Sequence, residues 1–241
     1  MLTSHGINYG PIQIQLPFRP NGFGAGSQML PAIYMTEGNS NKVHWDNIYG
    51  TKSPHEVSWT EDVPEISLSF IHSFNLPKTA NIIDIGGGES RLASYLLDDG
   101  FVNVTVLDIS ERSIEKAKKQ LGKRFEKINW IVQDIIEFRA VQLFDCWHDR
   151  AAFHFLTTGE HISKYAALAR QYIKPNGYMV VGTFSEDGPE KCSGLSVRRY
   201  SEVTLANELS TGFQKLNCIT KDHITPFNIK QNFVFCSFKR N

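Results

Sequence analysis

Short apolar runs alternate with helical stretches through the middle of the chain, and this alternation restricts the fold more than any other feature. The helical stretches cover residues 92–97, 110–121 and 161–173, and the apolar runs cover residues 81–85, 102–107, 128–132, 143–147 and 178–184. Strands that alternate with helices in this way form a parallel sheet covered on both faces. The fold class that we predict is therefore α/β, with a doubly wound, mostly parallel sheet.

The end of the chain has a different pattern. Residues 213–221 and 231–238 read as two strands close together in sequence, with no helical stretch between them. Neighbouring strands of this kind pair antiparallel. We expect them to form an antiparallel C-terminal pair at the edge of a seven-stranded sheet.

The 241 residues are enough for one sizeable domain. Residues 1–40 are rich in glycine and proline and show no sustained period, so we expect an N-terminal extension there, with Met35 as an alternative native start. Residues 41–241 form the predicted domain. Its first regular element is a helix over residues 64–74, behind a proline suited to a first helical turn.

Charge and hydropathy narrow the class of protein. Lys plus Arg and Asp plus Glu both number 25, so no overall basic field is present and a nucleic-acid partner is disfavoured. No apolar run approaches the roughly 20 residues that cross a bilayer, and residues 1–10 lack the features of a secretion signal. We expect a cytoplasmic protein without a membrane partner.

The four cysteines do not form a metal or redox motif. Cys146, Cys218 and Cys236 lie in apolar runs, which predicts buried and reduced thiols, whereas Cys192 lies in a polar segment that we expect to be exposed. Because no CxxC pair occurs, no metal site is predicted.

A glycine-rich loop follows the first apolar run. Asp84 and Ile85 precede Gly86, Gly87 and Gly88, and the loop continues through Glu89 to Ser90. Glycines let a backbone approach a ligand closely, and ligands of open α/β sheets bind at the carboxyl ends of the strands. A glycine loop alone does not identify the ligand, because dinucleotide-binding folds have one too.

Acidic residues follow three successive strands and distinguish between cofactors. Asp84 stands where a dinucleotide site more often has an apolar residue, and it suits an amino group of the ligand. Asp108 ends the second strand, where an acid accepts hydrogen bonds from both ribose hydroxyls. Asp134, with Ile135 beside it, follows the third strand and suits an adenine amino group. The alternative is that each acid only caps a strand or helix.

With these motifs the chain resembles the class I S-adenosylmethionine-dependent methyltransferases over residues 45–239. The resemblance implies a Rossmann-like sheet and S-adenosylmethionine as the cofactor. It assigns to the cofactor the residues Asp84, Gly86, Gly87, Gly88, Asp108, Ile109, Asp134 and Ile135. One departure is Ser90, which stands where many members have a third glycine.

Residues 144–150 resemble the family's fourth motif, where the methyl group meets its acceptor. Methyl transfer needs no metal, and a base is needed only where the acceptor carries a proton. His148, Asp149 and His154 are the candidate bases. The alternatives are an ion pair between Asp149 and Arg150 beside a solvated His148, and a core position for His154.

Other residues were assigned by their place in the family's architecture. Trp59 and Trp45 precede the sheet, where members often lay a lid over the cofactor; we assign Trp59 to the cofactor and Trp45 to the substrate, with simple packing as the alternative. Among the acceptor contacts we also expect Arg150, Arg198, Arg199 and Tyr200. His223 is a further candidate for the same pocket.

The predicted function is methyl transfer from S-adenosylmethionine to a small molecule or a protein side chain. Two hypotheses stay open beside it. One is a catalytically inactive S-adenosylmethionine-binding module that serves as a partner or scaffold. The other is a nicotinamide-dependent oxidoreductase, for which Asp84 and Asp134 have no clear use.

Overall fold

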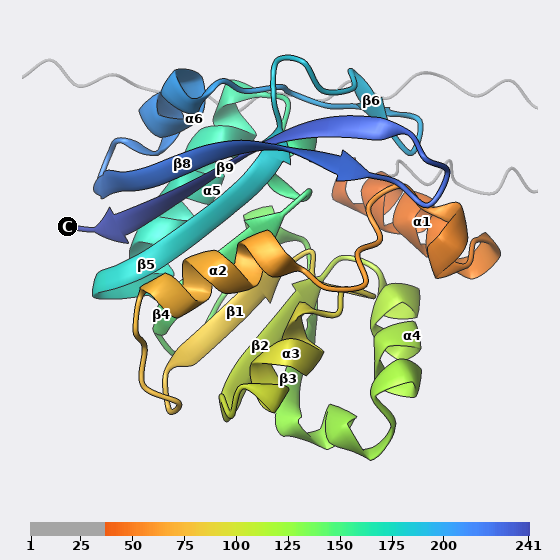
Figure 1. The fold of residues 1–241 in the computed structure, drawn as a ribbon, viewed down its shortest axis with the longest axis horizontal. Coiled ribbons are helices and arrows are strands. Elements are labelled where there is room, and N and C mark those ends of the chain that lie inside the picture. Colours follow the sequence, from red (N-terminus) through yellow and green to blue (C-terminus); the bar gives the residue numbers. More distant parts are fainter. Residues whose placement is uncertain (1–36) are drawn as a thin grey trace, which may run out of the picture. The chain divides into compact units, whose positions relative to one another are not determined.

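The computed structural model describes residues 37–241 (Figure 1). The expected extension over residues 1–40, and with it the question of a start at Met35, lies outside the described residues except for residues 37–40. These four residues belong to the first helix, α1, which spans Glu37–Thr51.

A seven-stranded sheet forms the centre of the described domain, as the sequence predicts. Its order is β3-β2-β1-β4-β5-β9-β8, with parallel pairing from β3 to β5 and antiparallel pairing of β9 with β5 and β8. The strands span Asn81–Ile85 (β1), Asn103–Asp108 (β2), Ile128–Val132 (β3), Phe144–Arg150 (β4), Ile173–Phe184 (β5), Phe213–Ile224 (β8) and Lys230–Arg240 (β9). The strand order reverses between β1 and β4, which is where open α/β sheets bind ligands.

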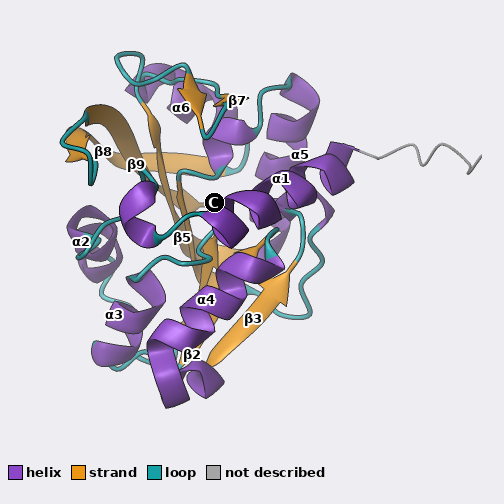
Figure 2. Ribbon diagram, turned by 90° about the vertical axis from the view of Figure 1, so that its right-hand side faces the viewer, coloured by secondary structure: helices purple, strands orange, loops and turns teal. Residues whose placement is uncertain are grey.

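Helices cover both faces of the sheet (Figures 1 and 2). On one face lie α2 (Glu65–Ser73), α3 (Leu92–Asp98) and α4 (Glu111–Leu121), and on the other lie α5 (Gly159–Tyr172) and α6 (Glu202–Leu209). The Ser110 hydroxyl accepts from the Ser113 amide at 3.2 Å and caps α4, so the predicted cap is confirmed.

Apolar clusters on both faces of the sheet result from the alternation of side chains along the strands. Ile82, Val104 and Val106 point to the face that α2 and α3 cover. Ile83 and Leu107 point to the opposite face and pack against α5 and α6. Because strand side chains alternate between faces, the parallel strands contribute apolar side chains to both faces, which explains the nearly continuous apolar runs in the sequence.

The fourth strand is longer than the sequence predicts. We expected it to end at Trp147, but β4 continues through His148, Asp149 and Arg150. Polar residues read as the end of a buried strand, yet each of these three forms hydrogen bonds with groups outside β4, which lets the pairing with β1 and β5 continue.

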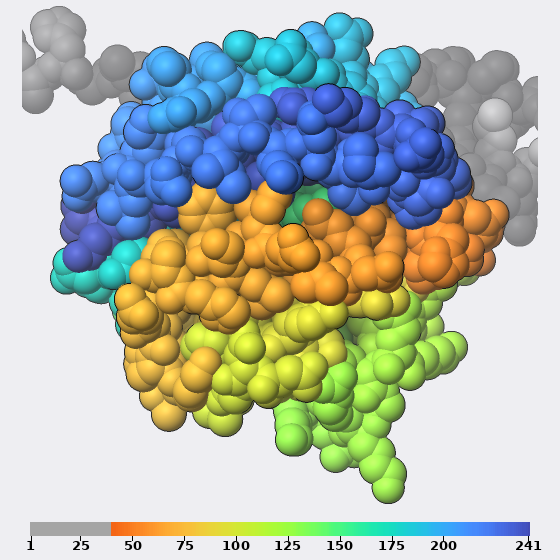
Figure 3. Space-filling model, viewed as in Figure 1, coloured from red at the N-terminus to blue at the C-terminus, as the bar shows by residue number. Residues whose placement is uncertain are grey.

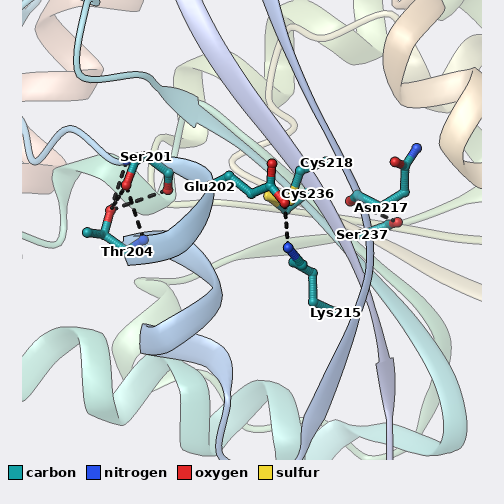
Figure 4. Close-up of a disulfide and its surroundings, with 8 residues drawn as sticks. All are labelled: Ser201, Glu202, Thr204, Lys215, Asn217, Cys218, Cys236 and Ser237. Carbon is teal, nitrogen blue, oxygen red and sulfur yellow. Dashed lines mark hydrogen bonds and ion pairs between the residues drawn. A yellow bond between two sulfur atoms is a disulfide. The ribbon is translucent and has the colours of Figure 1, made fainter.

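The predictions for three of the cysteines were wrong. Cys218 on β8 and Cys236 on β9 stand directly opposite each other and form a disulfide (Figure 4). Close antiparallel neighbours permit this bond, and sequence spacing alone did not reveal the register. Cys192 was expected to be exposed but is buried on a short hairpin of β6 (Lys191–Cys192) and β7 (Leu195–Ser196).

The edge strand β8 lies at the surface beside α2, as the blue and orange bands of Figure 3 show. Its side chains are mostly exposed, whereas those of β9 are mostly buried. At one end β8 is tied to α6 by the ion pair of Lys215 with Glu202 (Figure 4). Among residues 37–241, no helix combines the length and the apolar character that a membrane crossing requires.

Candidate functional site

Two neighbouring cavities lie at the carboxyl ends of the central strands. The larger has a volume of about 420 Å³ and runs along the ends of β1, β2 and β4. The smaller, of about 70 Å³, lies between the glycine loop and the segment that joins α1 to α2. Four residues line both cavities, namely Tyr49, Trp59, Gly86 and Arg150.

The glycine loop packs directly on the acidic side chains around it. Gly86 has φ +65°, a left-handed conformation that favours glycine, and a Cβ atom there would meet the Ala152 Cβ at 2.7 Å. A Cβ atom on Gly88 would lie 2.5 Å from Oδ2 of Asp108. The glycines therefore keep room for the carboxylates as well as for a ligand.

Asp84 takes part in a buried polar chain. One of its oxygens, Oδ1, shares a hydrogen bond of 2.7 Å with Nδ1 of His148, and Nε2 of His148 shares one of 2.8 Å with the Ser67 hydroxyl on α2. The other oxygen, Oδ2, is buried and has no partner among residues 37–241. The alternative of a solvated His148 is therefore wrong, because these two hydrogen bonds fix its buried ring beside the smaller cavity.

Asp108 is buried where β2 meets the larger cavity. It accepts from the Ser110 amide at 2.8 Å. Burial raises the pKa of the carboxyl from 3.8 to about 6, although hydrogen bonds from Ser110, Ser113 and Gly88 act in the opposite direction. A further donor, such as a ribose hydroxyl, would stabilise the ionised form.

The loop after β3 lines the far end of the larger cavity. Asp134 accepts from the Ile136 amide at 3.1 Å, and Gln133, Ile135 and Ile136 line the cavity beside it. Burial raises the pKa of Asp134 above its usual value. Ile109, after β2, lines the same cavity.

Four aromatic rings form a cluster at the near end of the larger cavity, and we call it the aromatic wall: Trp45, Tyr49, Trp59 and Phe155. Ring centroids lie 5.0 Å apart for Trp45 and Phe155, 5.8 Å for Trp45 and Trp59, and 6.0 Å for Tyr49 and Trp59. The helix α1 brings two of them into place.

The position of α1 is fixed by Asp46. Its carboxylate accepts from the Ser110 hydroxyl at 2.7 Å, and Arg112 donates to its backbone carbonyl at 3.2 Å. The start of α4 therefore anchors the helix that carries Trp45 and Tyr49.

Arg150 connects β4 to the segment between α1 and α2. Its Nη1 donates to the Trp59 carbonyl at 2.9 Å, and its Nη2 lies 3.0 Å from the Glu61 carboxylate. Neither Nε nor Nη2 forms a hydrogen bond within the described part of the chain, so Nη2 meets Glu61 as an ion pair only. Burial lowers the pKa of the guanidinium, while Glu61 and Asp84 act against this change. The structure thus pairs Arg150 with Glu61 rather than with Asp149.

Asp149 and His154 do not line either cavity. The Asp149 carboxylate accepts from the Phe153 amide at 3.0 Å and from the Tyr165 hydroxyl at 2.8 Å, and burial raises its pKa to about 6. The His154 ring stacks on Phe184 at 4.5 Å, and burial lowers its pKa to about 3.

Three of the expected acceptor contacts also lie outside the cavity linings. Arg198 pairs with Glu208 at 2.5 Å, and Arg199 pairs with Glu190 at 3.2 Å. Tyr200 is fully buried against the core. His223 shares a hydrogen bond of 2.7 Å with the Ser58 carbonyl, so it supports the segment before α2 from outside.

Some residues of the site were not assigned from the sequence. Tyr49 lies four positions after Trp45 and thus on the same face of α1, a spacing that offered a signal. Phe155 and Cys192 line the larger cavity from segments far apart in sequence. For Ser67, which completes the chain to Asp84, the sequence contained no signal.

Comparisons with known proteins agree with this geometry. A family model described as a methyltransferase domain matches residues 76–232. The ubiquinone biosynthesis O-methyltransferase of Rickettsia canadensis is 28% identical over 119 residues, which is 49% of each protein. The EEF1A lysine methyltransferase 2 of Danio rerio is 23% identical over 155 residues, covering 58% of this chain and 66% of that protein. The chain spans about half the length of the first curated relatives it matches.

Solved structures share the fold at low sequence identity. The N-methyltransferase NodS of Bradyrhizobium japonicum in complex with S-adenosyl-l-homocysteine has a TM-score of 0.59 at 17% identity, covering 75% of this chain and 89% of that one. The 1,6-didemethyltoxoflavin-N1-methyltransferase of Burkholderia thailandensis, with 1,6-didemethyltoxoflavin and S-adenosylhomocysteine bound, has a TM-score of 0.62 at 17% identity, covering 84% of each chain.

Proposed function

Because the chain belongs to the family of methyltransferase domains, we propose that it transfers a methyl group from S-adenosylmethionine to a nucleophile on a small molecule or a protein side chain. The observation that carries the proposal is the buried Oδ2 of Asp84, which has no partner among residues 37–241 although it lies beside the glycine loop. A buried carboxylate oxygen is costly without a donor, and the amino group of the cofactor would supply one.

The two cavities suit the two halves of this cofactor. The smaller cavity, beside Asp84, would take the amino acid tail. The larger one would take the adenosine, with Asp108 for the ribose and Asp134, Ile135 and Ile109 around the adenine. Tyr49, Trp59, Gly86 and Arg150 line both cavities, so the reactive sulfonium would lie between these four residues.

The chemistry rests on positioning. The cofactor supplies an activated methyl group, and the protein must hold the acceptor in line with it and keep water away. The aromatic wall would keep water away, since two of its rings, Tyr49 and Trp59, line both cavities. The set of candidate bases becomes smaller in this proposal: His148 acts through Asp84 as a positioning residue, and Asp149 holds the turn after β4.

Calorimetry with S-adenosylhomocysteine tests the cofactor. Binding to the wild-type protein and a clear loss in Asp84→Asn would support the proposal, because the amide retains the shape but loses the charge. The matched control is Asp98→Asn, an exposed acid on α3 that pairs with Arg124 at 2.6 Å. An absence of binding by the wild-type protein would overturn the proposal.

Labelled cofactor in a cell extract tests the acceptor. We expect label in the small-molecule fraction, and label confined to protein would point to a side chain instead. The family membership leaves no place for the oxidoreductase hypothesis, and no contact within residues 37–241 favours an inactive module.

The proposed compartment is the cytoplasm. Two buried free cysteines, Cys146 and Cys192, are compatible with it. The disulfide of Cys218 with Cys236 argues in the other direction, because reducing compartments rarely maintain such bonds. The redox state of this pair in the protein isolated from its own cells would decide the point.

A further inference from the structure

One end of the larger cavity would hold the methyl acceptor, and we call it the acceptor end. The aromatic wall, the small side chain of Ala151 and the thiol of Cys192 surround it, and Arg150 is the charged group there. The acidic lining residues of this cavity, Asp108, Asp134 and Glu137, follow β2 and β3, and they belong to the adenosine end.

The acceptor end therefore offers no base within residues 37–241. His148 lines the other cavity, Asp149 and His154 line neither, and His161 lies on α5 next to Lys164 at the adenosine end. Cys192 does not serve either, because burial raises the pKa of its thiol to about 11 and keeps it neutral. The attacking atom of the methyl acceptor must therefore carry an unprotonated lone pair when it binds.

Arg150 is the only cation that lines both cavities in the described part of the chain, and not all of its N–H groups have a hydrogen-bond acceptor there. Nη1 donates to the Trp59 carbonyl and Nη2 forms an ion pair with Glu61, but neither Nε nor Nη2 has a hydrogen-bond acceptor among residues 37–241. A buried donor without an acceptor is unfavourable, and an anion is the strongest acceptor that a guanidinium can receive.

From these contacts we infer that the acceptor is a small aromatic thiol, which binds as its thiolate against the aromatic wall and beside Arg150. The inference rests on the proposed methyl transfer and names the substrate class of the same site. Flat rings suit the wall, because aromatic groups pack edge to face and offset at the centroid distances seen there.

Ionisation distinguishes a thiol from a phenol and from an alkyl amine. Thiols lose their proton at a pKa of about 8.5, phenols at about 10 and alkyl amines at about 10.4. A protonated amine has no free lone pair, and its charge would be repelled by Arg150 and by the sulfonium. A carboxylic acid ionises more readily, at a pKa of about 4, but its oxygens are much weaker nucleophiles than sulfur. A thiolate combines an accessible anion with a strong nucleophile, and a neighbouring guanidinium favours that anion further.

The reaction balances without another reactant. The thiol releases its proton to solvent on binding, and the thiolate sulfur forms a bond to the methyl carbon as the bond from that carbon to the sulfonium breaks. The electron pair of the broken bond stays on the cofactor's sulfur, so the products are a methyl thioether and neutral S-adenosylhomocysteine. Opposite charges disappear in this step, and apolar walls favour their loss because they solvate ions poorly.

The binding test uses 4-nitrobenzenethiol, whose thiolate absorbs visible light. It is titrated with pH in the presence of the protein and S-adenosylhomocysteine. We expect the wild-type protein to shift the thiol's ionisation to lower pH, and Arg150→Gln to abolish this shift. Glu61→Gln is the matched control: it breaks the ion pair in the same cluster but leaves the guanidinium, so the shift should persist.

The activity test uses benzenethiol, phenol and benzylamine with S-adenosylmethionine, and mass spectrometry identifies the products. We expect S-methylation of benzenethiol. In Arg150→Gln, kcat/KM should be lower by roughly ten- to a hundredfold, because this is the change expected when a hydrogen bond to a charged group is lost. The rise of kcat/KM with pH should follow the pKa of each substituted benzenethiol.

Two outcomes would overturn the inference: methylation of benzylamine or phenol in preference to the thiol, or an unchanged ionisation of 4-nitrobenzenethiol on binding. The calorimetry with S-adenosylhomocysteine separates the two proposals. If that ligand binds but no thiol is bound or methylated, the substrate class fails and the proposed methyl transfer stands. If S-adenosylhomocysteine itself does not bind, the proposed function fails first.

Discussion

Asp108→Asn should make the free protein more stable while it weakens cofactor binding. The Asp108 side chain is buried, and burial raises its pKa from 3.8 to about 6. This change corresponds to roughly 3 kcal/mol in favour of the protonated carboxyl. At pH 8 the folded protein bears this cost, because the same carboxylate ionises freely in the unfolded chain. The asparagine side chain has a similar shape and carries no charge.

The net stability gain is smaller than the full cost. The amide oxygen can still accept from the Ser110 amide, but the amide nitrogen loses the bonds from Ser113 and Gly88, at about 1 kcal/mol each. We therefore expect the free energy of unfolding at pH 8 to rise by roughly 1 kcal/mol, or about 2–4 °C in Tm.

The pH dependence has a definite sign. A carboxyl whose folded pKa is raised contributes stability that is fully present below pH 3.8 and is lost as the pH rises through about 6. The amount by which the Tm of Asp108→Asn exceeds that of the wild-type protein should therefore decrease as the pH falls from 8 to 5.

Cofactor binding should change in the opposite direction. Loss of hydrogen bonds to a charged acceptor costs on the order of 1.5–3 kcal/mol, which is roughly a 10- to 150-fold rise in Kd for S-adenosylhomocysteine at pH 8. Calorimetry and thermal unfolding by circular dichroism measure both effects, with Glu115→Gln on the exposed face of α4 as the control. Equal affinity, or a lower Tm of the variant at pH 8, would refute the reasoning.

Three further predictions concern other parts of the site and fold. His148→Ala leaves two buried partners without a hydrogen bond, so the free energy of unfolding should fall by about 2–5 kcal/mol and S-adenosylhomocysteine should bind more weakly; unchanged thermal unfolding would contradict the polar chain. Gly88→Ala should weaken that binding at least tenfold, because its Cβ would meet a carboxylate at 2.5 Å, whereas Gly159→Ala, with open space around it, should not. Reduction of the Cys218–Cys236 disulfide, whose cysteines are 18 positions apart, should lower the free energy of unfolding by about 3 kcal/mol in chemical denaturation, and an unchanged midpoint would show that the bond does not constrain the unfolded chain.

Much of the architecture followed from the sequence because its signals are local. The alternation of apolar runs with helical stretches predicted the parallel sheet, and the two final runs predicted its antiparallel edge. Ser110 predicted the start of α4, since a cap bonds to an amide only three positions away. Asp84, Asp108 and Asp134 were found because strand ends of a parallel sheet meet at one edge, wherever the strands lie in sequence.

The roles of β4 residues depended on contacts that no spacing predicts. His148 reaches Ser67, 81 positions earlier, and Arg150 reaches the Trp59 carbonyl, 91 positions earlier. A histidine and an arginine after a strand read as solvated when nothing is known of their surroundings. In the fold both are held by partners from other segments, because a polar group removed from water must find a partner wherever the fold supplies one.

The sequence by itself determined which groups stand at the edge of the sheet: the glycines, the acids at the ends of β1 and β2 and after β3, and the polar end of β4. Tertiary structure alone decided which of them keep a free atom for a ligand. Oδ2 of Asp84 is left without a partner because His148 bonds the other oxygen, and Nε of Arg150 is left without one although Nη1 bonds the segment before α2. Hydrogen-bond capacity that remains after folding is a property of the packed chain, since it depends on segments that are distant in sequence and adjacent only in space.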